Sequence, residues 1–237
     1  MQNKQKIINQ KIEEIYDTFA KYSPEPNIRF CDCCYSKDEH QNLKRILSSP
    51  AKIFTAHDLS EYESALAIGG WSQTKTIKYI LPLYMESILS IESDIYPDTF
   101  FYFIEHIKDK EWRDNEKELI ESSLLSLLDY YLDTHPDMVY EKVSRIDFNR
   151  LLTMFEYLNS NKALDLWLKH TNYTSILYLK EFLYGYYSQR NKPIEKWLEN
   201  PKNRKVFTDK IEKLIVFETQ EVSEKDLVEL NILYEFL

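Results

Sequence analysis

The sequence predicts an all-α fold, and three observations support this class. Glycine occurs only three times in 237 residues, whereas hairpin turns and phosphate-binding loops use glycine for positive φ angles. Apolar residues recur at steps of three and four along most of the chain, which is the period of an amphipathic helix. Prolines and capping patterns divide this spacing into segments of helical length. We therefore expect about a dozen helices with short connections and no strand.

The first helix is predicted over residues 4–21, where one apolar face repeats with helical spacing. Pro24 and Pro26 follow it, and each proline biases the residue before it away from the helical conformation. The predicted face comprises Ile7, Ile8, Ile12, Ile15, Tyr16 and Phe19.

Two capping boxes predict the starts of the next two helices. Ser36 is followed by Glu39, so each side chain can bond the other's backbone N–H, and this helix is expected to stop before Pro50. Asp58 and Glu61 repeat the pattern for a helix that ends at the pair Gly69-Gly70. The apolar residues of these two helices are Leu43, Ile46, Leu47, Leu59, Tyr62, Leu66 and Ile68.

The longest apolar helix is predicted to begin at Trp71 and to contain Pro82. A proline inside a helix removes one backbone hydrogen bond, so we expect a kink there. The apolar residues of this helix are Ile77, Ile80, Leu81, Tyr84, Met85, Ile88 and Leu89.

The same helical spacing continues to the C-terminus. His135 and His170 each stand at a predicted helix end, where a histidine side chain can hydrogen-bond the last carbonyl groups of the helix. The run Leu214–Phe217 is rich in β-branched residues but keeps helical spacing on either side. Helices are predicted over residues 100–107, 119–132, 138–146, 147–158, 164–168, 173–187, 193–198, 201–217 and 223–236.

The domain organisation is predicted from the order of these helices. Successive helix pairs of about 35 to 45 residues from Asp98 onward indicate an irregular α-solenoid. No low-complexity linker interrupts the chain. We therefore predict one domain over residues 1–237, with N-terminal helices and the cysteine loop in 1–95 and stacked helix pairs in 96–237.

Net charge and composition limit the classes of partner and the cellular compartment that we expect. The chain has 39 acidic and 30 basic residues and a net charge of −9, which disfavours nucleic acid and anionic membranes because both attract basic surfaces. The first residues are polar and lead into an amphipathic helix, unlike a signal peptide. No apolar run approaches the roughly 20 residues that span a bilayer. We expect a cytoplasmic protein that binds neither nucleic acid nor membrane.

The three cysteines form one cluster, which carries the strongest candidate for chemistry. Cys31 and Cys34 make a CxxC pair, and His40 and His57 follow. Zinc prefers three or four sulfur or nitrogen ligands in a tetrahedron, and these four residues are the candidate ligands. Two alternatives are a redox thiolate near the Ser36 helix start and buried thiols that pack the loop onto the helices. A cysteine-histidine dyad of Cys34 and His57 is a further alternative.

Catalytic motifs are missing from the rest of the sequence. There is no G-x-S-x-G, no Walker A sequence, no G-x-G-x-x-G and no HExxH, and these motifs carry nucleophilic, phosphate, dinucleotide and zinc-hydrolase chemistry. His106, His135 and His170 are isolated in the sequence. Acidic pairs are expected by chance and by helix capping in so acidic a chain. We predict a protein that is not an enzyme and needs no cofactor.

Tyrosines supply the candidate partner-binding residues. Tyrosine is favoured in interfaces because a large ring ends in a polar group. In the predicted helix over 173–187 the apolar face leaves Tyr184 and Tyr187 partly outward, and Tyr130 and Tyr131 form a second pair. We predict that these four side chains contact a partner. The alternative is half-buried packing between neighbouring helices.

A cysteine-rich segment, a proline break and a Leu-Pro helix follow one another over residues 31–86. The residues that carry this pattern are Cys31, Cys34, Ser36, Leu47, Pro50, Leu59, Tyr62, Ala65, Trp71, Leu81 and Pro82. The pattern resembles the start of a family of uncharacterised helical bacterial proteins. In that family a Cys-rich tetrapeptide precedes Ser-Pro-Glu-Glu, and a Trp-Gly pair precedes the Leu-Pro helix. Here Lys37-Asp38 replaces Pro-Glu, and Ser72 follows Trp71.

The resemblance covers roughly a quarter of the chain. It implies a helical bacterial cytosolic protein and no established activity, so no catalytic residue is carried over from it. Acidity, tyrosine-rich segments and missing catalytic motifs together predict a non-catalytic protein-binding protein. One version is an immunity protein that neutralises a toxin with a basic domain. The alternatives are a zinc-binding or cysteine-dependent enzyme and a structural assembly subunit.

Overall fold

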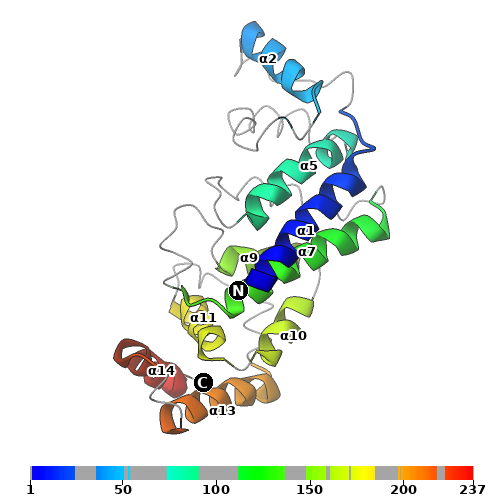
Figure 1. The fold of residues 1–237 in the computed structure, drawn as a ribbon. Helices are drawn as coiled ribbons and strands as arrows, with labels where there is room; N and C mark the ends of the chain where they lie inside the picture. Colours follow the sequence, from blue (N-terminus) through cyan, green and yellow to red (C-terminus); the bar gives the residue numbers. More distant parts are fainter. Residues whose placement is uncertain are drawn as a thin grey trace. The chain divides into compact units, whose positions relative to one another are not determined.

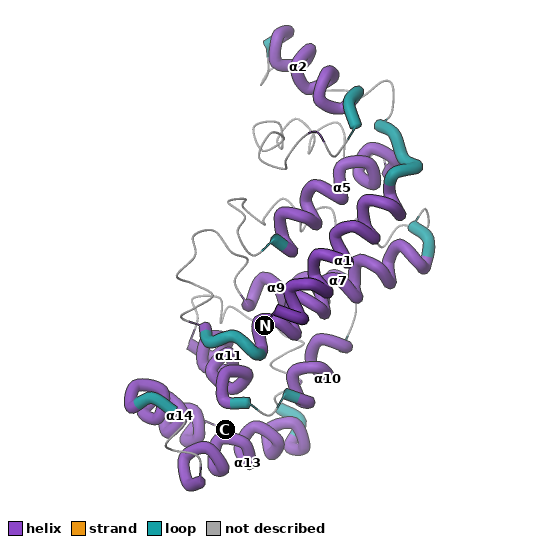
Figure 2. The backbone as a smooth tube through the Cα atoms, viewed as in Figure 1, coloured by secondary structure: helices purple, strands orange, loops and turns teal. Residues whose placement is uncertain are grey.

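All regular structure in the described part of the chain is helical (Figures 1 and 2). A computed structural model describes residues 2–24, 36–50, 53, 74–90, 112–136, 148–158, 161–170, 172–184, 197, 199–217 and 222–236. The helices within these ranges are α1 (Gln2–Phe19), α2 (Lys37–Leu47), α5 (Thr74–Leu89), α7 (Asp114–Leu132), α9 (Phe148–Tyr157), α10 (Lys162–Lys169), α11 (Tyr173–Tyr184), α13 (Pro201–Phe217) and α14 (Glu224–Phe236). The predicted all-α class is confirmed. The predicted dozen helices and their α-solenoid arrangement stay predictions.

The described helices divide into two compact units. The N-terminal unit contains α1, α2, α5 and α7 as far as Ser126. The C-terminal unit contains α7 from Leu127 onward together with α9, α10, α11, α13 and α14. The prediction of one domain over 1–237 stays a prediction, and the two units are described separately below.

In the N-terminal unit α1 packs along α5, as Figure 1 shows. Tyr16 of α1 donates a hydrogen bond to the carboxylate of Glu86 on α5. Burial and this bond raise the pKa of the Tyr16 phenol. Pro82 lies inside α5 as predicted. The fully or nearly fully buried apolar residues of the two helices are Ile8, Ile15, Phe19, Ile77, Ile80, Leu81, Leu83, Tyr84, Met85 and Leu89.

Helix α2 begins with the predicted capping box. The Ser36 hydroxyl accepts from the backbone N–H of Glu39 at 3.3 Å, and the Glu39 carboxylate accepts from the backbone N–H of Ser36 at 2.6 Å. The side-chain and backbone bonds from Ser36 lower the pKa of Glu39. The helix ends at Leu47, before Pro50, as predicted. The second predicted box, at residues 58–61, lies outside the described residues.

A buried ion pair holds the start of α7 in the N-terminal unit. The Glu116 carboxylate is fully buried and accepts from the ammonium group of Lys78, itself 3% exposed, at 2.8 Å. Lys21 and the Tyr22 hydroxyl also reach this carboxylate. The Lys78 ammonium lies 4.8 Å from the centre of the Trp112 ring, which adds cation–π attraction.

The pKa of Glu116 reflects the balance between the burial of its carboxylate and the hydrogen bonds that the carboxylate accepts. Burial alone would raise the pKa, because it disfavours the charged form. Hydrogen bonds from Lys78, Tyr22 and Lys21 outweigh burial and lower the pKa to about 2. Glu116 therefore stays ionised although no part of its side chain is exposed.

The C-terminal unit has an aromatic core centred on Trp167 of α10. Phe148 of α9 meets this ring edge-on with centroids 4.9 Å apart, and Phe207 of α13 does so at 5.4 Å. Phe148 also stacks on Tyr178 of α11 at 4.4 Å. Such arrangements suit the quadrupoles of aromatic rings. These three contacts join α9, α10, α11 and α13.

A second apolar cluster joins α11, α13 and α14. Its buried members are Ile176, Leu177, Ile211, Leu214, Val222, Leu230 and Leu233. Helix α13 remains helical through its β-branched end, as the outer spacing predicted. Helix α14 starts as predicted, with the Ser223 hydroxyl accepting from the backbone N–H of Asp226 at 3.1 Å.

We expect Glu116→Gln to destabilise the N-terminal unit. The substitution leaves the Lys78 ammonium buried without its anion, and breaking a buried pair in this way costs about 3 to 5 kcal/mol. Denaturant unfolding at neutral pH measures the loss. Glu118→Gln, a change at an exposed position of the same helix, is the control and should change stability by less than about 0.5 kcal/mol.

The loss of stability caused by Glu116→Gln should become smaller as the pH falls. Because the folded-state pKa of Glu116 lies below its ordinary 4.5, its contribution is complete above pH 4.5 and is lost as the pH falls toward about 2. The gap between the native chain and Glu116→Gln should narrow across that window. A gap that stays constant would contradict the assignment.

Candidate functional site at the end of helix α7

The predicted zinc ligands fall mostly outside the described residues. This applies to Cys31, Cys34 and His57, whereas His40 lies half-buried on α2. No group of three or more His, Cys, Asp or Glu side chains within the described ranges is arranged to hold a metal ion. The predicted site at Cys31, Cys34, His40 and His57 stays a prediction.

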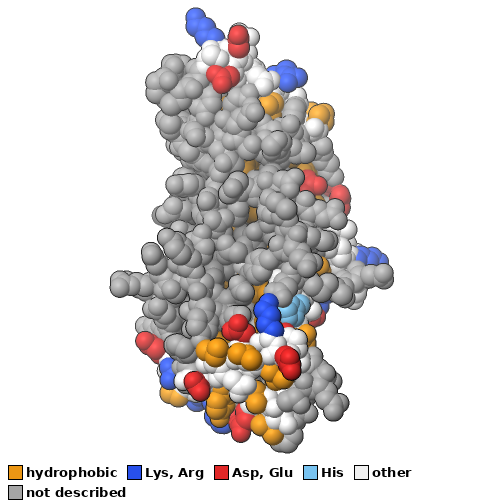
Figure 3. Space-filling model, turned by 90° about the vertical axis from the view of Figure 1, so that its left-hand side faces the viewer, with side chains coloured by type: hydrophobic (Ala, Val, Ile, Leu, Met, Phe, Trp, Pro, Cys, Tyr) orange, Lys and Arg blue, Asp and Glu red, His pale blue; other side chains and the backbone are white. Residues whose placement is uncertain are grey.

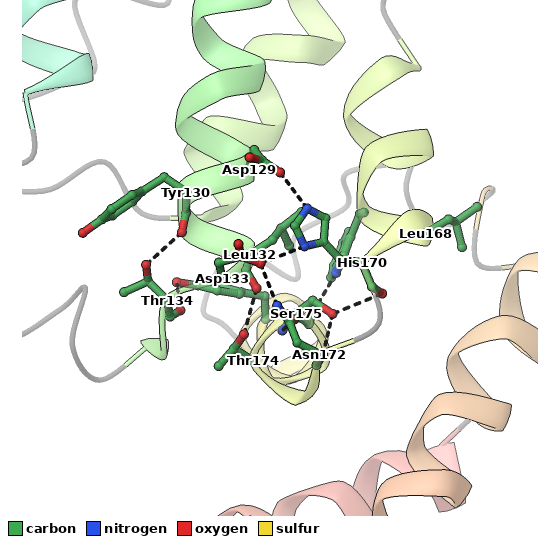
Figure 4. A network of polar contacts seen from close by, with 12 residues as sticks. Asp129, Tyr130, Leu132, Asp133, Thr134, Leu168, His170, Asn172, Thr174 and Ser175 are labelled. Atoms are coloured by element: carbon green, nitrogen blue, oxygen red, sulfur yellow. Dashed lines mark hydrogen bonds and ion pairs between the residues drawn. The ribbon is translucent and has the colours of Figure 1, made fainter. Parts of the chain in front are cut away.

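The four tyrosines predicted to bind a partner lie in different surroundings. Tyr187 lies outside the described residues, and Tyr184 is the last residue of α11, with its side chain undescribed. Tyr130 is half-buried, and its ring points away from the polar network beside it (Figure 4). Tyr131 is 2% exposed and stacks on Tyr178 with the planes 8° apart. The ring of Tyr131 therefore packs inside the C-terminal unit, and partner contact by the four tyrosines stays a prediction.

The C-terminal end of α7 is the most densely bonded polar region of the C-terminal unit (Figure 4). A helix leaves its last four carbonyl groups without partners inside the helix. The Thr134 hydroxyl donates to the Tyr130 carbonyl and the Thr174 hydroxyl to the Leu132 carbonyl, both at 2.8 Å. The Tyr178 hydroxyl donates to the Thr134 carbonyl at 3.1 Å. Helix α11 therefore supplies donors to the end of α7.

His170 bridges the two carboxylates that face it from α7. Its Nε2 lies 2.8 Å from Asp129 Oδ1, and its Nδ1 lies 3.1 Å from Asp133 Oδ1. The carboxylates are about one-third exposed, at 34% and 37%, and the ring is 13% exposed. The ring therefore links the end of α10 to the end of α7.

Asn172 extends the same network to α11. Its amide nitrogen donates to Asp133 Oδ1 at 2.7 Å, and its amide oxygen accepts from the backbone N–H of Ser175 at 3.0 Å. The second bond is an N-cap contact, because it satisfies one of the first N–H groups of α11. One side chain thus caps α11 and fixes Asp133.

Lys210 of α13 closes the network at the end of α10. Its ammonium group donates to the carbonyl groups of Leu168 at 3.0 Å and of His170. A lysine at this place satisfies the last carbonyls and favours the negative end of the helix dipole. Burial lowers the pKa of Lys210 to about 8.

A second histidine bonds to the start of α14. His135 Nε2 lies 3.2 Å from Asp226 Oδ2, which also accepts from the Ser223 hydroxyl at 2.7 Å. The order along these bonds is Ser–Asp–His. Nucleophilic catalysis requires the base between serine and carboxylate. This arrangement therefore ties His135 to the cap of α14 and does not activate the Ser223 hydroxyl.

Both histidines were treated as isolated in the sequence, and that interpretation was wrong. Their partners lie 41 and 91 residues away, so no local pattern contains them. The i, i+4 spacing of Asp129 and Asp133 at a helix end was the one available signal. The prediction that His170 stands at a helix end is confirmed, since it is the C-cap of α10.

No protein-family model, no curated protein and no solved structure matches this chain. Among the described helices, none combines the length and the apolar character needed to cross a membrane. The site is therefore interpreted from its own geometry.

We expect His170→Phe to lower the unfolding free energy of the C-terminal unit by about 1 to 3 kcal/mol. The change removes the ring's contacts with the Asp129 and Asp133 carboxylates, and a hydrogen bond to a charged group is worth about 1.5 to 3 kcal/mol before solvent exposure weakens it. A double-mutant cycle with Asp129→Asn isolates the pair. Non-additivity above about 0.5 kcal/mol supports this link, and simple additivity would exclude it. Asp165→Asn, on the exposed side of α10, is the matched control.

The pKa of Lys210 predicts a second pH effect, with the same sign as that of Glu116 but in an alkaline window. The folded chain releases this proton near pH 8 and the unfolded chain near 10.5, so unfolding takes up a proton between them. The unfolding free energy should therefore rise through this window. Lys210→Met should remove that rise, whereas Lys202→Met at an exposed position of α13 should keep it. Equal slopes for Lys210→Met and the native chain would contradict the prediction.

Proposed function

We propose that the chain is a non-catalytic protein-binding protein that contacts its partner through the outer face of α14. The observation that carries this proposal is an apolar stripe on that face. Val228 is 61% exposed, and Ile232, one turn further along, is 39% exposed. Figure 3 shows hydrophobic side chains next to acidic ones in its lower part. An exposed apolar stripe with a polar rim is typical of a protein contact.

The buried face of α14 strengthens this argument. Leu230 and Leu233 on the opposite side are fully buried in the cluster with α11 and α13. A surface helix normally carries apolar residues on one face, and a helix that is apolar on both faces is typical of one covered on both sides. Among the described residues, this apolar cluster covers one face of α14. We infer that a partner covers the other.

The charges beside the stripe define the chemistry of that partner. Glu224 and Glu235 are exposed at the two ends of the stripe. A partner that buries Val228 and Ile232 would bring its own side chains beside these carboxylates. The partner we propose therefore combines apolar side chains with a basic group opposite Glu235.

In one version of this proposal the chain is an inhibitor, and the outer face of α14 binds a basic toxin domain. Its support is the net charge of −9, which would speed association with a basic protein. Cytoplasmic residence and an irregular α-solenoid belong to the same proposal. Stacked helix pairs would leave outer helix faces such as that of α14 available.

The polar networks support the non-catalytic part of the proposal. Both ring nitrogens of His170 face carboxylates, so the ring is engaged on both sides. Ser223 bonds to Asp226, which separates it from His135. These groups hold helix ends together, which leaves the surface of α14 as the functional feature.

We expect Val228→Asp with Ile232→Asp to abolish partner binding, because two buried charges would replace the apolar contact. Affinity capture from the native cell identifies the partner, and titration with the purified partner measures affinity. The double variant should bind at least about 100-fold more weakly, a loss typical of central interface residues. Ile7→Asp, at a 39% exposed position of α1, should bind normally. Undiminished binding by the double variant would overturn the proposal.

A further inference from the structure

Lys210 of α13 is held at the end of α10 by neutral groups. Its ammonium group donates to the carbonyl groups of Leu168 and His170 and lies 5.5 Å from the centre of the Phe207 ring. The side chain is half-buried, and within the described ranges no carboxylate pairs with it. The ammonium group is therefore partly removed from water without a counterion, which disfavours its charged form.

Two other lysines show what a carboxylate changes. Lys78 is more deeply buried, but its ammonium group bonds to Glu116 at 2.8 Å. Lys205, on the same helix as Lys210, is 72% exposed and bonds to Asp209 at 2.8 Å, which raises the pKa of Lys205. Burial instead lowers the pKa of Lys210 to about 8. At pH 8 about half of the Lys210 side chains are therefore neutral, against less than about 1% for an ordinary lysine.

The two carbonyl bonds also decide where the nitrogen of Lys210 can react. The nitrogen is tetrahedral, with one position taken by the side-chain carbon and two N–H groups directed at the carbonyls of Leu168 and His170. The fourth position carries the third proton of the ammonium group and becomes a lone pair when that proton leaves. The neutral amine is the nucleophilic form of lysine. It keeps both hydrogen bonds at the end of α10 while its lone pair lies outside them.

We propose that Lys210 is an acylation site that reacts directly with small acyl phosphates. The Nζ lone pair forms a bond to the acyl carbon, and the bond from that carbon to the phosphate oxygen breaks. The proton lost from Nζ passes to the released phosphate. A small reagent is assigned because the side chain is half-buried. The site shares no residue with the outer face of α14, so it does not depend on the proposed function.

Acylation of Lys210 would change the contact between α10 and α13. The amide product is neutral and has one N–H group, so it can bond to one of the two carbonyls and leaves the other without this donor. The end of α10 also loses a positive charge that favours the negative end of the helix dipole. We therefore expect acylation to loosen the C-terminal unit.

Reaction of the folded full chain with acetyl phosphate at pH 8 tests the proposal, with each lysine followed by mass spectrometry of proteolytic peptides. Lys210 should be acetylated at least about tenfold faster than Lys205, because a far larger fraction of it is neutral. The rate at Lys210 should level off above about pH 8, whereas the rate at Lys205 should continue to rise. In denaturant the two rates should become equal, because the difference depends on the fold.

A charge-preserving variant tests the effect on stability. Lys210→Arg keeps a positive charge and hydrogen-bond donors but has no lysine amine to acylate. Treatment with acetyl phosphate should lower the denaturant midpoint of the native chain and leave that of Lys210→Arg unchanged. Lys205→Arg, an exposed position on the same helix, is the matched control and should respond as the native chain does.

Two results would overturn the acylation site. One is acetylation of Lys210 that is no faster than that of Lys205 in the folded chain, and the other is a rate ratio that denaturant leaves unchanged. Fast acetylation with equal midpoint shifts in the native chain and Lys210→Arg would support the site and overturn its effect on the contact between α10 and α13.

Discussion

The carbonyl groups at the C-terminal ends of helices are the constraint on which the C-terminal unit depends. Helices commonly end on a glycine whose positive φ lets following N–H groups turn back to the last carbonyls. The chain has three glycines, Gly69, Gly70 and Gly185, and the described ends of α7 and α10 contain none of them. Side chains satisfy these carbonyls instead. Thr134, Thr174 and Lys210 each donate to the end of α7 or of α10.

This way of ending helices also connects them. A glycine cap is local, whereas Thr174 and Lys210 come from α11 and α13 and bond across 42 residues of sequence. The donors that complete one helix therefore position the next. His170 adds a side-chain contact at the same place, because its backbone caps α10 while its ring contacts Asp129 of α7 and Asp133 just after that helix. The clustered polar side chains at the end of α7 thus bond to helix ends and to one another.

Helix positions could be predicted from the sequence because their causes are local. The Ser36–Glu39 box, the stop before Pro50 and the helical spacing around Leu214 each depend on residues within one or two turns, and the structure contains all three. The partners of His135 and His170 could not be predicted, since they depend on how distant helices pack. Tyr131 shows the same limit. Its neighbour Tyr130 looks equivalent in the sequence. In the structure it is Tyr131 that stacks on Tyr178.

The same reasoning explains why we propose an interaction surface on α14 and not in the polar network. Groups at the end of α7 are already compensated, and a ligand there would have to displace bonds from His170 or Asn172. A binding surface needs groups whose burial is still favourable, and apolar side chains in water have this property at about 25 cal/mol per Å². Val228 and Ile232 are such groups. Their exposure is the reason why we propose the outer face of α14 as the contact surface.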